Sequence, residues 1–164
     1  MADLTIRAAE PVDAESIAAI YNQGIEDRLA TLETQTRSAE ERRGWLAARG
    51  ARHPVLVAEV DGRVVSWGSL NAFNPRPAYD HVADFSVYVS REWRGRGVGH
   101  RLLEALIARG RELGYHKLVL AAFPFNAAGV ALYRRLGFTE VGVYREQGRL
   151  DGRWVDVVVM ERIL

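Results

Sequence analysis

Apolar residues recur at two different spacings along this chain of 164 residues, and the spacing separates helices from strands. Short runs rich in valine, leucine and isoleucine predict strands, whereas apolar side chains three and four positions apart predict helices. Helices are predicted to begin near residues 11, 38, 98 and 126, and strands at 4–8, 55–60, 64–70, 83–89, 118–123, 139–145 and 154–162. The resulting order, β-α-α-β-β-β-α-β-α-β-β, predicts an α/β protein with a mixed sheet.

Capping and turn residues mark several of the predicted boundaries. Asp13 is expected to cap the first helix, and Ser38 with Glu41 three positions later matches a capping box at the start of the second. Asp61 and Gly62 separate two apolar runs, as in a hairpin with a two-residue turn. These signals predict an antiparallel hairpin between the second and third strands.

Two of the predicted strands indicate the edge and the centre of the sheet. Leu4 to Ala8 alternates weakly and is typical of an edge strand, whereas the apolar run Leu118 to Phe123 predicts a central strand buried on both faces. Residues 71–82 are polar, contain two prolines and predict a loop. The third helix has one apolar face, made of Val98, Leu102, Leu103, Leu106, Ile107 and Leu113.

The composition excludes several classes of protein. The chain has no cysteine, which excludes disulfides, thiolate metal sites and a cysteine nucleophile. A net charge of +1 gives no support for binding nucleic acid or a membrane surface. No apolar run approaches the roughly 20 residues of a membrane span, and the N-terminus has no signal pattern. We therefore expect one domain over residues 1–164, a cytoplasmic location and no metal.

The most informative segment is the glycine loop, Arg94 to Gly99, which joins a predicted strand to a predicted helix. Glycines at 95, 97 and 99 allow positive φ and let a ligand approach the main chain closely. The amides exposed there, together with the positive end of the helix, form an anion site. Positive charge is added by Arg91, Arg94, Arg96 and Arg101. The segment therefore predicts a phosphate-binding loop.

Three other glycine-rich motifs do not fit this segment. A dinucleotide fingerprint needs a glycine where His100 stands and an acidic residue about 20 positions later, where this chain has none. A P-loop needs Gly-Lys-Ser/Thr, but the only lysine of the chain is Lys117. An RNA-binding Arg-Gly tract is repetitive and disordered, whereas this loop leads directly into an amphipathic helix.

The spacing Arg94-x-x-Gly97-x-Gly99 resembles the signature with which the GNAT acetyltransferase superfamily holds the pyrophosphate of acetyl-CoA. The segment Asn126 to Phe138 is similar to a later motif of that superfamily, and both motifs have its order and separation. The resemblance covers essentially the whole chain and implies the GNAT fold, with a central mixed sheet splayed at the acetyl-CoA site. It implies cofactor contacts at Val87, Val89, Arg94, Gly95, Arg96, Gly97, Val98, Gly99 and Asn126.

Two side chains have the chemistry that acetyl transfer to an amine needs. Asp84 is a carboxylate inside an apolar strand and is the candidate general base, directly or through a water; capping the preceding loop is its alternative role. The resemblance places Tyr133 near the cofactor sulfur as the candidate general acid, and packing in the core is its alternative role. His81 is a second candidate base.

Three shorter patches are similar to the phosphinothricin and methionine sulfone/sulfoximine acetyltransferases: Ile20-Tyr21-Asn22, Arg76 to Asp80, and Gly152-Arg153-Trp154-Val155-Asp156. The similarity implies an acceptor α-amino acid whose side chain ends in an oxidised sulfur, phosphorus or arsenic group. Arg76 and Tyr79 are expected to bind this acceptor, and Phe73 is expected to line its pocket. Asp84 and Tyr133 depart from this subfamily, which usually has Glu and often His at those positions.

The sequence thus predicts an N-acetyltransferase for a small amino-acid-like amine, with acetyl-CoA as co-substrate and no covalent enzyme intermediate. One alternative is a GNAT enzyme that acetylates another small amine, or a protein N-terminus or lysine, and a closing loop at 76–80 disfavours the protein acceptors. A second is a non-catalytic acyl-CoA-binding domain, which the presence of Asp84 and Tyr133 disfavours. The resemblance also implies a homodimer, for which the aromatic-rich C-terminal strands are the candidate interface.

Overall fold

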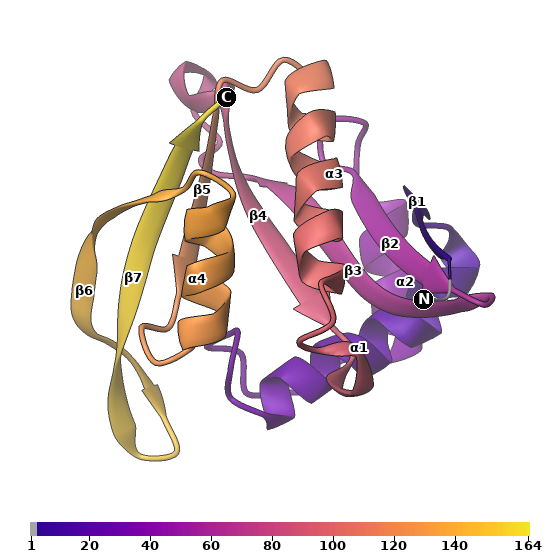
Figure 1. Ribbon diagram of the computed structural model, residues 1–164, viewed down its shortest axis with the longest axis horizontal. Coiled ribbons are helices and arrows are strands. Elements are labelled where there is room, and N and C mark those ends of the chain that lie inside the picture. The colour runs from indigo at the N-terminus through magenta and orange to yellow at the C-terminus, as the bar shows by residue number, and fades with distance from the viewer. Residues whose placement is uncertain (1–2) are drawn as a thin grey trace.

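A computed structural model describes residues 3–164, and its seven strands form one mixed sheet (Figure 1). The strand order across the sheet is β1-β2-β3-β4-β5-β7-β6. The strands are β1 (Leu4–Ala8), β2 (Val55–Val60), β3 (Arg63–Ala72), β4 (Val82–Val89), β5 (Lys117–Ala122), β6 (Thr139–Leu150) and β7 (Arg153–Ile163). The helices are α1 (Ala14–Glu26), α2 (Ala39–Ala47), α3 (Val98–Glu112) and α4 (Ala127–Arg135), with short 3-10 turns at 11–13, 77–79 and 91–93.

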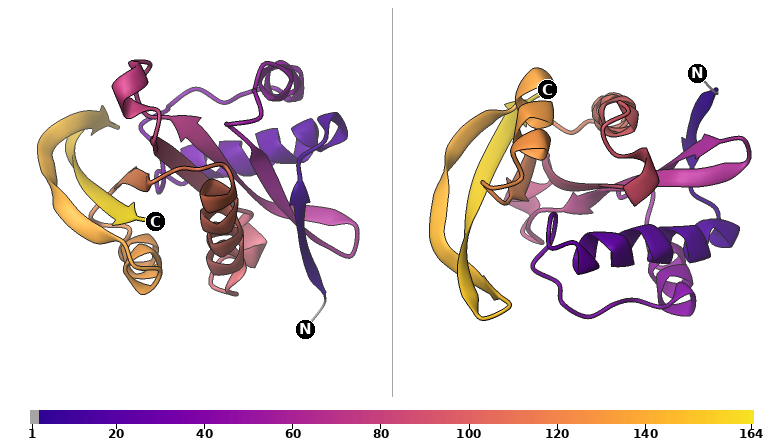
Figure 2. Two further views of the ribbon diagram at one scale, coloured as in Figure 1. Left: turned by 90° about the horizontal axis from the view of Figure 1, so that it is seen from above. Right: turned by 60° about the horizontal axis from the view of Figure 1, so that its bottom comes forward.

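Helices cover the two faces of the sheet in pairs (Figure 2). The helices α3 and α4 lie on one face, where Leu103 and Leu106 of α3 pack with Phe85 of β4 and Phe138 after α4. The helices α1 and α2 lie on the other face, where Ile17 and neighbouring side chains pack against Trp67 and β2. Burying both faces of the central strands in this way supplies the main stabilisation of the fold.

The strands β4 and β5 run parallel but separate along their length. Only Val82, Ala83 and Asp84 of β4 pair with β5, opposite Lys117, Leu118 and Val119. Beyond Asp84 the remaining β4 residues pair with β3 alone, so the two strands diverge toward the N-terminus of α3 and the start of α4. We call this divergence the fork, and it is the splay that the sequence resemblance implies.

Most of the predicted elements are confirmed. The order of the strands and long helices is the predicted one, β1 lies at an edge of the sheet, and β5 lies inside it. Asp61 and Gly62 both have positive φ, 49° and 76°, as a primed two-residue hairpin turn requires. Ser38 caps α2 by accepting a hydrogen bond from the Glu41 amide at 3.1 Å.

Asp13 is the N-cap residue of α1, as predicted, but its side chain makes no capping hydrogen bond to that helix. Its carboxylate instead accepts hydrogen bonds from the Arg7 guanidinium at 2.8 and 3.0 Å and from the Glu10 amide at 2.7 Å. Pro11 begins a 3-10 turn before the helix, and this turn brings Asp13 within reach of the edge strand. An ion pair with β1 therefore replaces the expected cap.

Two strand predictions need correction. The run 118–123 is not buried on both faces, because α1 contacts β3 and β4, α2 packs against Trp67 of β3, and one face of β5 stays partly open. Leu118 and Leu120 are buried, whereas Ala121 is exposed. β6 continues to Leu150, five residues beyond the predicted end, because a second turn at Asp151 and Gly152 joins it to β7 in a long hairpin.

Within residues 3–164, no helix is both long and apolar enough to cross a membrane. The same residues contain no group of three or more acidic or histidine side chains that could hold a metal ion.

Candidate active site

The glycine loop presents the N-terminus of α3 to a cleft. Gly95 and Gly97 have φ of 76° and 81°, and a Cβ added at either would meet nothing within 4 Å. Gly97 is the N-cap of α3 and provides no side-chain cap, so the first amides of the helix have no local side-chain acceptor. This arrangement suits the phosphate groups of a bound ligand.

Gly99 differs from its two neighbours. It lies within α3 and does not have positive φ, so only Gly95 and Gly97 use the conformational freedom that all three glycines allow. A Cβ at Gly99 would contact Leu132 and Val89 at 3.5 Å, which is an ordinary contact distance. Its role is therefore close packing between α3, α4 and β4.

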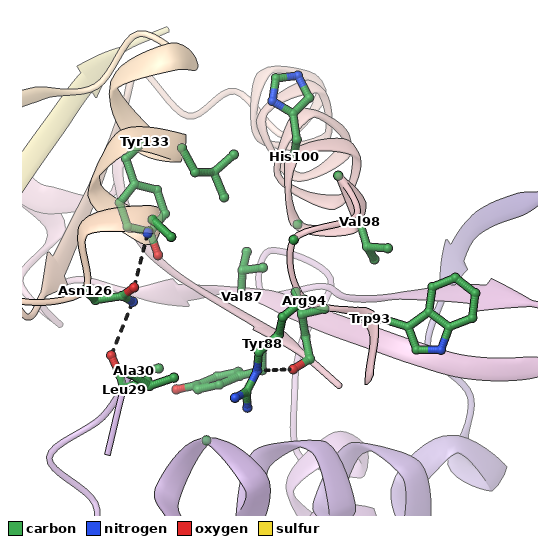
Figure 3. Close-up of a pocket in the computed structure, with 18 of the residues that line it drawn as sticks. Leu29, Ala30, Val87, Tyr88, Trp93, Arg94, Val98, His100, Asn126 and Tyr133 are labelled. Atoms are coloured by element: carbon green, nitrogen blue, oxygen red, sulfur yellow. Dashed lines mark hydrogen bonds between the residues drawn. The ribbon is translucent and has the colours of Figure 1, made fainter. Parts of the chain in front are cut away.

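The arginines of the glycine loop bind protein groups as well as adding charge. Arg94 donates to the Asp27 carboxylate at 2.6 Å and to the Val89 carbonyl at 3.2 Å, and Figure 3 shows its guanidinium directed toward α1. Arg91 also binds Asp27, at 2.9 and 3.0 Å, and both guanidiniums hold the pKa of Asp27 below its ordinary value. Arg96 lies over the ring of Trp93, outside the cleft lining. Arg94 thus fixes the loop to α1.

A cleft of about 320 Å³ runs from the glycine loop toward the fork (Figure 3). Its walls come from the end of α1 and the segment after it, from β4, from the start of α3 and from α4. The predicted cofactor-binding residues in its lining are Val87, Val89, Arg94, Gly95, Gly97, Val98, Gly99 and Asn126. All of the predicted cofactor contacts except Arg96 are therefore brought together in one cleft.

The cleft continues into a smaller cavity of about 50 Å³ at the fork. Residues 85–88 of β4 form one side of this cavity, and residues 120–122 of β5 form the other. Because β4 is paired with β3 alone here, its second edge faces the cavity with backbone groups that an extended ligand can pair with. A linear amide-containing arm fits such an edge.

Asn126, the N-cap of α4, and Tyr133 within that helix both line the cleft. Asn126 caps the helix by accepting from the Gly129 amide at 3.2 Å, and it donates to the Leu29 carbonyl at 3.3 Å. Tyr133 lines both cavities and packs against Phe85, with ring centroids 5.8 Å apart. Burial raises the pKa of Tyr133, so its phenol stays protonated and can donate.

Asp84 stands where β4 and β5 last pair. Its side chain is largely buried, and burial raises its pKa to about 6, while a hydrogen bond from Asn71 opposes this shift. The Asn71 amide nitrogen lies 3.3 Å from Asp84 Oδ1. A carboxylate with this pKa is ionised at neutral pH and is a stronger base than an exposed aspartate.

The predicted acceptor-binding residues lie together on the loop between β3 and β4. The rings of Phe73 and Tyr79 are 5.6 Å apart, and both side chains, like Arg76, are exposed. This loop joins the end of β3 to the start of β4, the two strand ends that carry the paired residues Asn71 and Asp84. His81, the second candidate base, instead lies near His116, with ring centroids 6.0 Å apart, and lines neither the cleft nor the fork cavity.

Sequence reasoning missed Tyr88 and Asn71. Tyr88 lines both cavities and packs against Tyr21 and Trp67, and burial raises its pKa. Its position four residues after Asp84 places it on the same strand face, which is the signal that could have found it. Asn71 lies in a separate strand, and only the cross-strand register brings it to Asp84.

Comparisons with known proteins agree with this geometry. Residues 18–138 match the acetyltransferase (GNAT) family, a range that includes the glycine loop, Asp84 and Tyr133. The chain is 36% identical over 159 residues to the L-methionine sulfoximine/L-methionine sulfone acetyltransferase of Pseudomonas paraeruginosa, which covers 96% of this chain and 92% of that protein.

Two solved structures are similar over nearly the whole chain. The ribosomal-protein-alanine N-acetyltransferase of Brucella melitensis superposes with a TM-score of 0.94 at 39% identity, covering 98% of this chain and 99% of that chain. A phosphinothricin acetyltransferase of Sinorhizobium meliloti, solved in complex with acetyl-CoA, superposes with a TM-score of 0.93 at 32% identity, covering 98% and 88%. The cleft thus belongs to a fold that holds acetyl-CoA in a relative.

Proposed function

The chain belongs to the acetyltransferase (GNAT) family, and we propose that it transfers the acetyl group of acetyl-CoA to the amine of a small amino-acid-like acceptor, with Asp84 as general base and Tyr133 as general acid. One observation carries the proposal. The largely buried Asp84 carboxylate belongs to the last residue of β4 that pairs with β5, and the lining of the fork cavity begins at the next residue, Phe85, so a ligand arm lying along β4 from the glycine loop would end beside it.

Acetyl-CoA fits the residues present. The first amides of α3 and the open space at Gly95 and Gly97 suit its pyrophosphate, and the unpaired edge of β4 suits its amide-containing arm. Asn126 would border that arm from the α4 side. When bound, acetyl-CoA supplies a thioester whose C–S bond breaks as the new C–N bond forms.

The residues at the fork provide the proton transfers for this exchange. Asp84, which is ionised at neutral pH, takes a proton from the acceptor ammonium through a water, so that the amine reaches the carbonyl carbon neutral. A β4 amide donates to the oxyanion that forms on the carbonyl oxygen. Tyr133 donates a proton to the departing thiolate, and the second proton that the nitrogen loses as the amide forms restores the phenol.

The acceptor is an α-amino acid that has an oxidised sulfur or phosphorus group on its side chain. Similarity to enzymes named for methionine sulfoximine, methionine sulfone and phosphinothricin supports this class. Arg76 and Tyr79 are exposed on the loop that joins β3 to β4, and they supply a guanidinium and a hydroxyl, which suit a tetrahedral oxyanion. Phe73 packs beside Tyr79 and forms an apolar wall for the methylene chain.

A second acceptor class is the N-terminal alanine of a protein. The 39% identity to the Brucella melitensis ribosomal-protein-alanine N-acetyltransferase favours it. A peptide acceptor has no side-chain oxyanion for Arg76 to bind, so the two classes differ in their dependence on that residue.

The test is release of free coenzyme A from acetyl-CoA with a panel of acceptors. We expect methionine sulfone, methionine sulfoximine and phosphinothricin to be turned over far faster than methionine, glutamate and spermidine. A peptide beginning with alanine completes the panel. Turnover confined to that peptide would replace the amino-acid acceptor by a protein N-terminus, and no release with any acceptor would contradict the proposal.

The enzyme is also proposed to act as a homodimer through the hairpin of β6 and β7. Exposed apolar side chains gather on this hairpin, and they are Val141, Val143, Tyr144, Trp154 and Ile163. β6 is exposed along residues 139–147 and forms an edge of the sheet. A long exposed edge with apolar side chains favours pairing with another chain.

A further inference from the structure

The half-buried guanidinium of Arg49 is linked to the candidate base Asp84 by hydrogen bonds through one intervening side chain, Asn71. We propose that Arg49 and Asn71 are positioning residues for Asp84: Arg49 fixes the orientation of the Asn71 amide, and that amide holds the Asp84 carboxylate. The inference rests on the proposed role of Asp84 as general base.

Arg49 is held rigidly just after the end of α2. Its Nε donates to the His53 carbonyl at 2.9 Å, and its Nη2 donates to the Leu70 carbonyl at 2.6 Å and to Asn71 Oδ1 at 2.8 Å. The guanidinium carbon lies 4.4 Å from the centre of the Trp45 ring, which supports it by a cation–π contact. Within residues 3–164 it forms no ion pair with a carboxylate. Its charge is therefore directed at the end of β3.

The contact with Arg49 decides which way the Asn71 amide faces. A guanidinium has donors only, so the amide oxygen must face Arg49 and the amide nitrogen must face away from it. The nitrogen then lies 3.3 Å from Asp84 Oδ1 and 3.4 Å from the Ser86 hydroxyl. With the amide reversed, its oxygen would face the carboxylate and repel it.

Asn71 and Asp84 are direct cross-strand partners, so the contact is built into the sheet register. Within the described residues, Oδ1 of Asp84 accepts from Asn71, and Oδ2 has no hydrogen-bond partner. This relay, from Arg49 through Asn71 to Asp84, thus holds one carboxylate oxygen and leaves the other for the acceptor amine or its water. Donation by an amide that is itself polarised by a guanidinium favours the ionised carboxylate.

The other polar groups around Asp84 are accounted for. Tyr88 faces it from β4, with Tyr21 of α1 beyond, and burial raises the pKa of Tyr88, so its phenol stays protonated at neutral pH. On the β5 side, Val119 is its register partner, and Lys117 is paired with Glu161 of β7. Arg42 of α2 stacks on Trp45 and Tyr21 instead of contacting Asp84. Asn71 is thus the direct donor, and Arg49 acts through it.

The test is a carbon-detected NMR titration of the Asp84 carboxyl, assigned by its loss in Asp84→Asn. We expect Asn71→Ala and Arg49→Gln each to raise the pKa of Asp84 by about one pH unit, the size expected for losing one hydrogen bond to a charged group. The apparent pKa of the acidic limb in the plot of kcat against pH should rise by the same amount, while KM for acetyl-CoA stays unchanged. Arg49→Lys, which keeps a donor for Asn71 Oδ1, should restore most of the wild-type pKa.

Matched controls separate positioning from loss of structure. Arg52→Gln removes a nearby arginine that stacks on Tyr115 and does not contact Asn71, so Asp84 should titrate as in the wild type. In the Asn71→Ala background, Arg49→Gln should add no further shift, because the relay passes through the amide. Additive shifts, or an unchanged pKa of Asp84 in Asn71→Ala, would overturn the proposal.

The titration also separates this inference from the proposed function. The pKa of Asp84 is read from the carboxyl signal and does not depend on turnover. Normal turnover of Asp84→Asn would end the role of Asp84 as base and with it the catalytic part of the inference. A shifted pKa in the relay variants would still establish the contact. A lowered kcat without a pKa shift would contradict the relay alone.

Discussion

At the scale of single residues, the strongest claim is that Asp84 removes the acceptor proton. Asp84→Asn should lower kcat by roughly 10²–10⁴, the usual contribution of a positioned base, and leave the Kd for acetyl-CoA near the wild-type value. Wild-type activity should rise with pH through about 6, where Asp84 ionises, and the variant should lack that limb. Turnover kinetics from pH 5 to 10 check both, with Asp80→Asn on the exposed loop as control. Normal turnover of Asp84→Asn at pH 7 would contradict the assignment.

The same carboxylate should reduce the stability of the fold. Its pKa is about 6 when folded and 3.8 ordinarily, so the folded state binds more protons between those values and stability falls as pH rises through them. At pH 7 the cost is about 2–3 kcal/mol. Asp84→Asn should therefore be more stable than wild type at pH 7, with the difference vanishing near pH 4, as urea unfolding at both pH values can check. An equal gain at both would exclude ionisation as the cause.

Asp84 and Tyr133 could be singled out from the sequence because each is unusual in its own segment or matches a motif by spacing. Asn71 and Arg49 could not, because their relation to Asp84 depends on strand register and on where α2 ends. The same limit applies to Arg94: its spacing matched the phosphate signature, but its ion pair is with Asp27, a residue 67 positions earlier. Local sequence patterns do not show which distant residues a side chain will contact, because those contacts depend on the tertiary fold.

At the scale of elements, the glycine loop should bind acetyl-CoA through its backbone. Gly97→Val places a β-branched residue at φ 81°, where strain costs about 1–2 kcal/mol and the side chain enters the space before the α3 amides. We expect a loss of at least tenfold in affinity by calorimetry. Gly99→Ala, which makes only ordinary contacts, should bind normally.

A second control isolates backbone strain from cofactor contact. Gly114 has φ of 85° in the turn after α3 and does not line the cleft. Gly114→Val should therefore lower thermal stability and leave the affinity for acetyl-CoA unchanged. An equal loss of affinity in Gly97→Val and Gly114→Val would mean that the glycine loop acts only through the fold.

The loop between β3 and β4 should bind the acceptor and should not contribute to binding of acetyl-CoA. Arg76→Ala should raise KM for methionine sulfone about tenfold, the order expected for one charge-assisted contact, and leave KM for acetyl-CoA nearly unchanged. The loss should be smaller for an acceptor without a side-chain oxyanion. Steady-state kinetics with both acceptors check this, and equal losses for the two would reduce the loop to a cover over the site.

Element order was predictable because most apolar runs have a clear period and the Asp61-Gly62 turn has the φ angles that its sequence predicts. Element length and coverage were not. β6 extends to Leu150 because its partner β7 continues the hairpin, and β5 is open on one face because α1 and α2 lie elsewhere. Both outcomes depend on neighbours that a local window does not include.

At the scale of the whole molecule, the outer hairpin should join two chains. β6 contributes an exposed edge, and Trp154 of β7 is 61% exposed, which is unusual for so large an apolar side chain. Light scattering should give twice the 18.3 kDa of one chain, and Trp154→Asp should reduce it toward a single chain, because a desolvated carboxylate opposes burial of that surface. Val12→Asp is the control, since Val12 is 77% exposed and lies in the turn before α1. A wild-type mass of one chain would contradict the dimer, and a Trp154→Asp dimer would place the interface elsewhere.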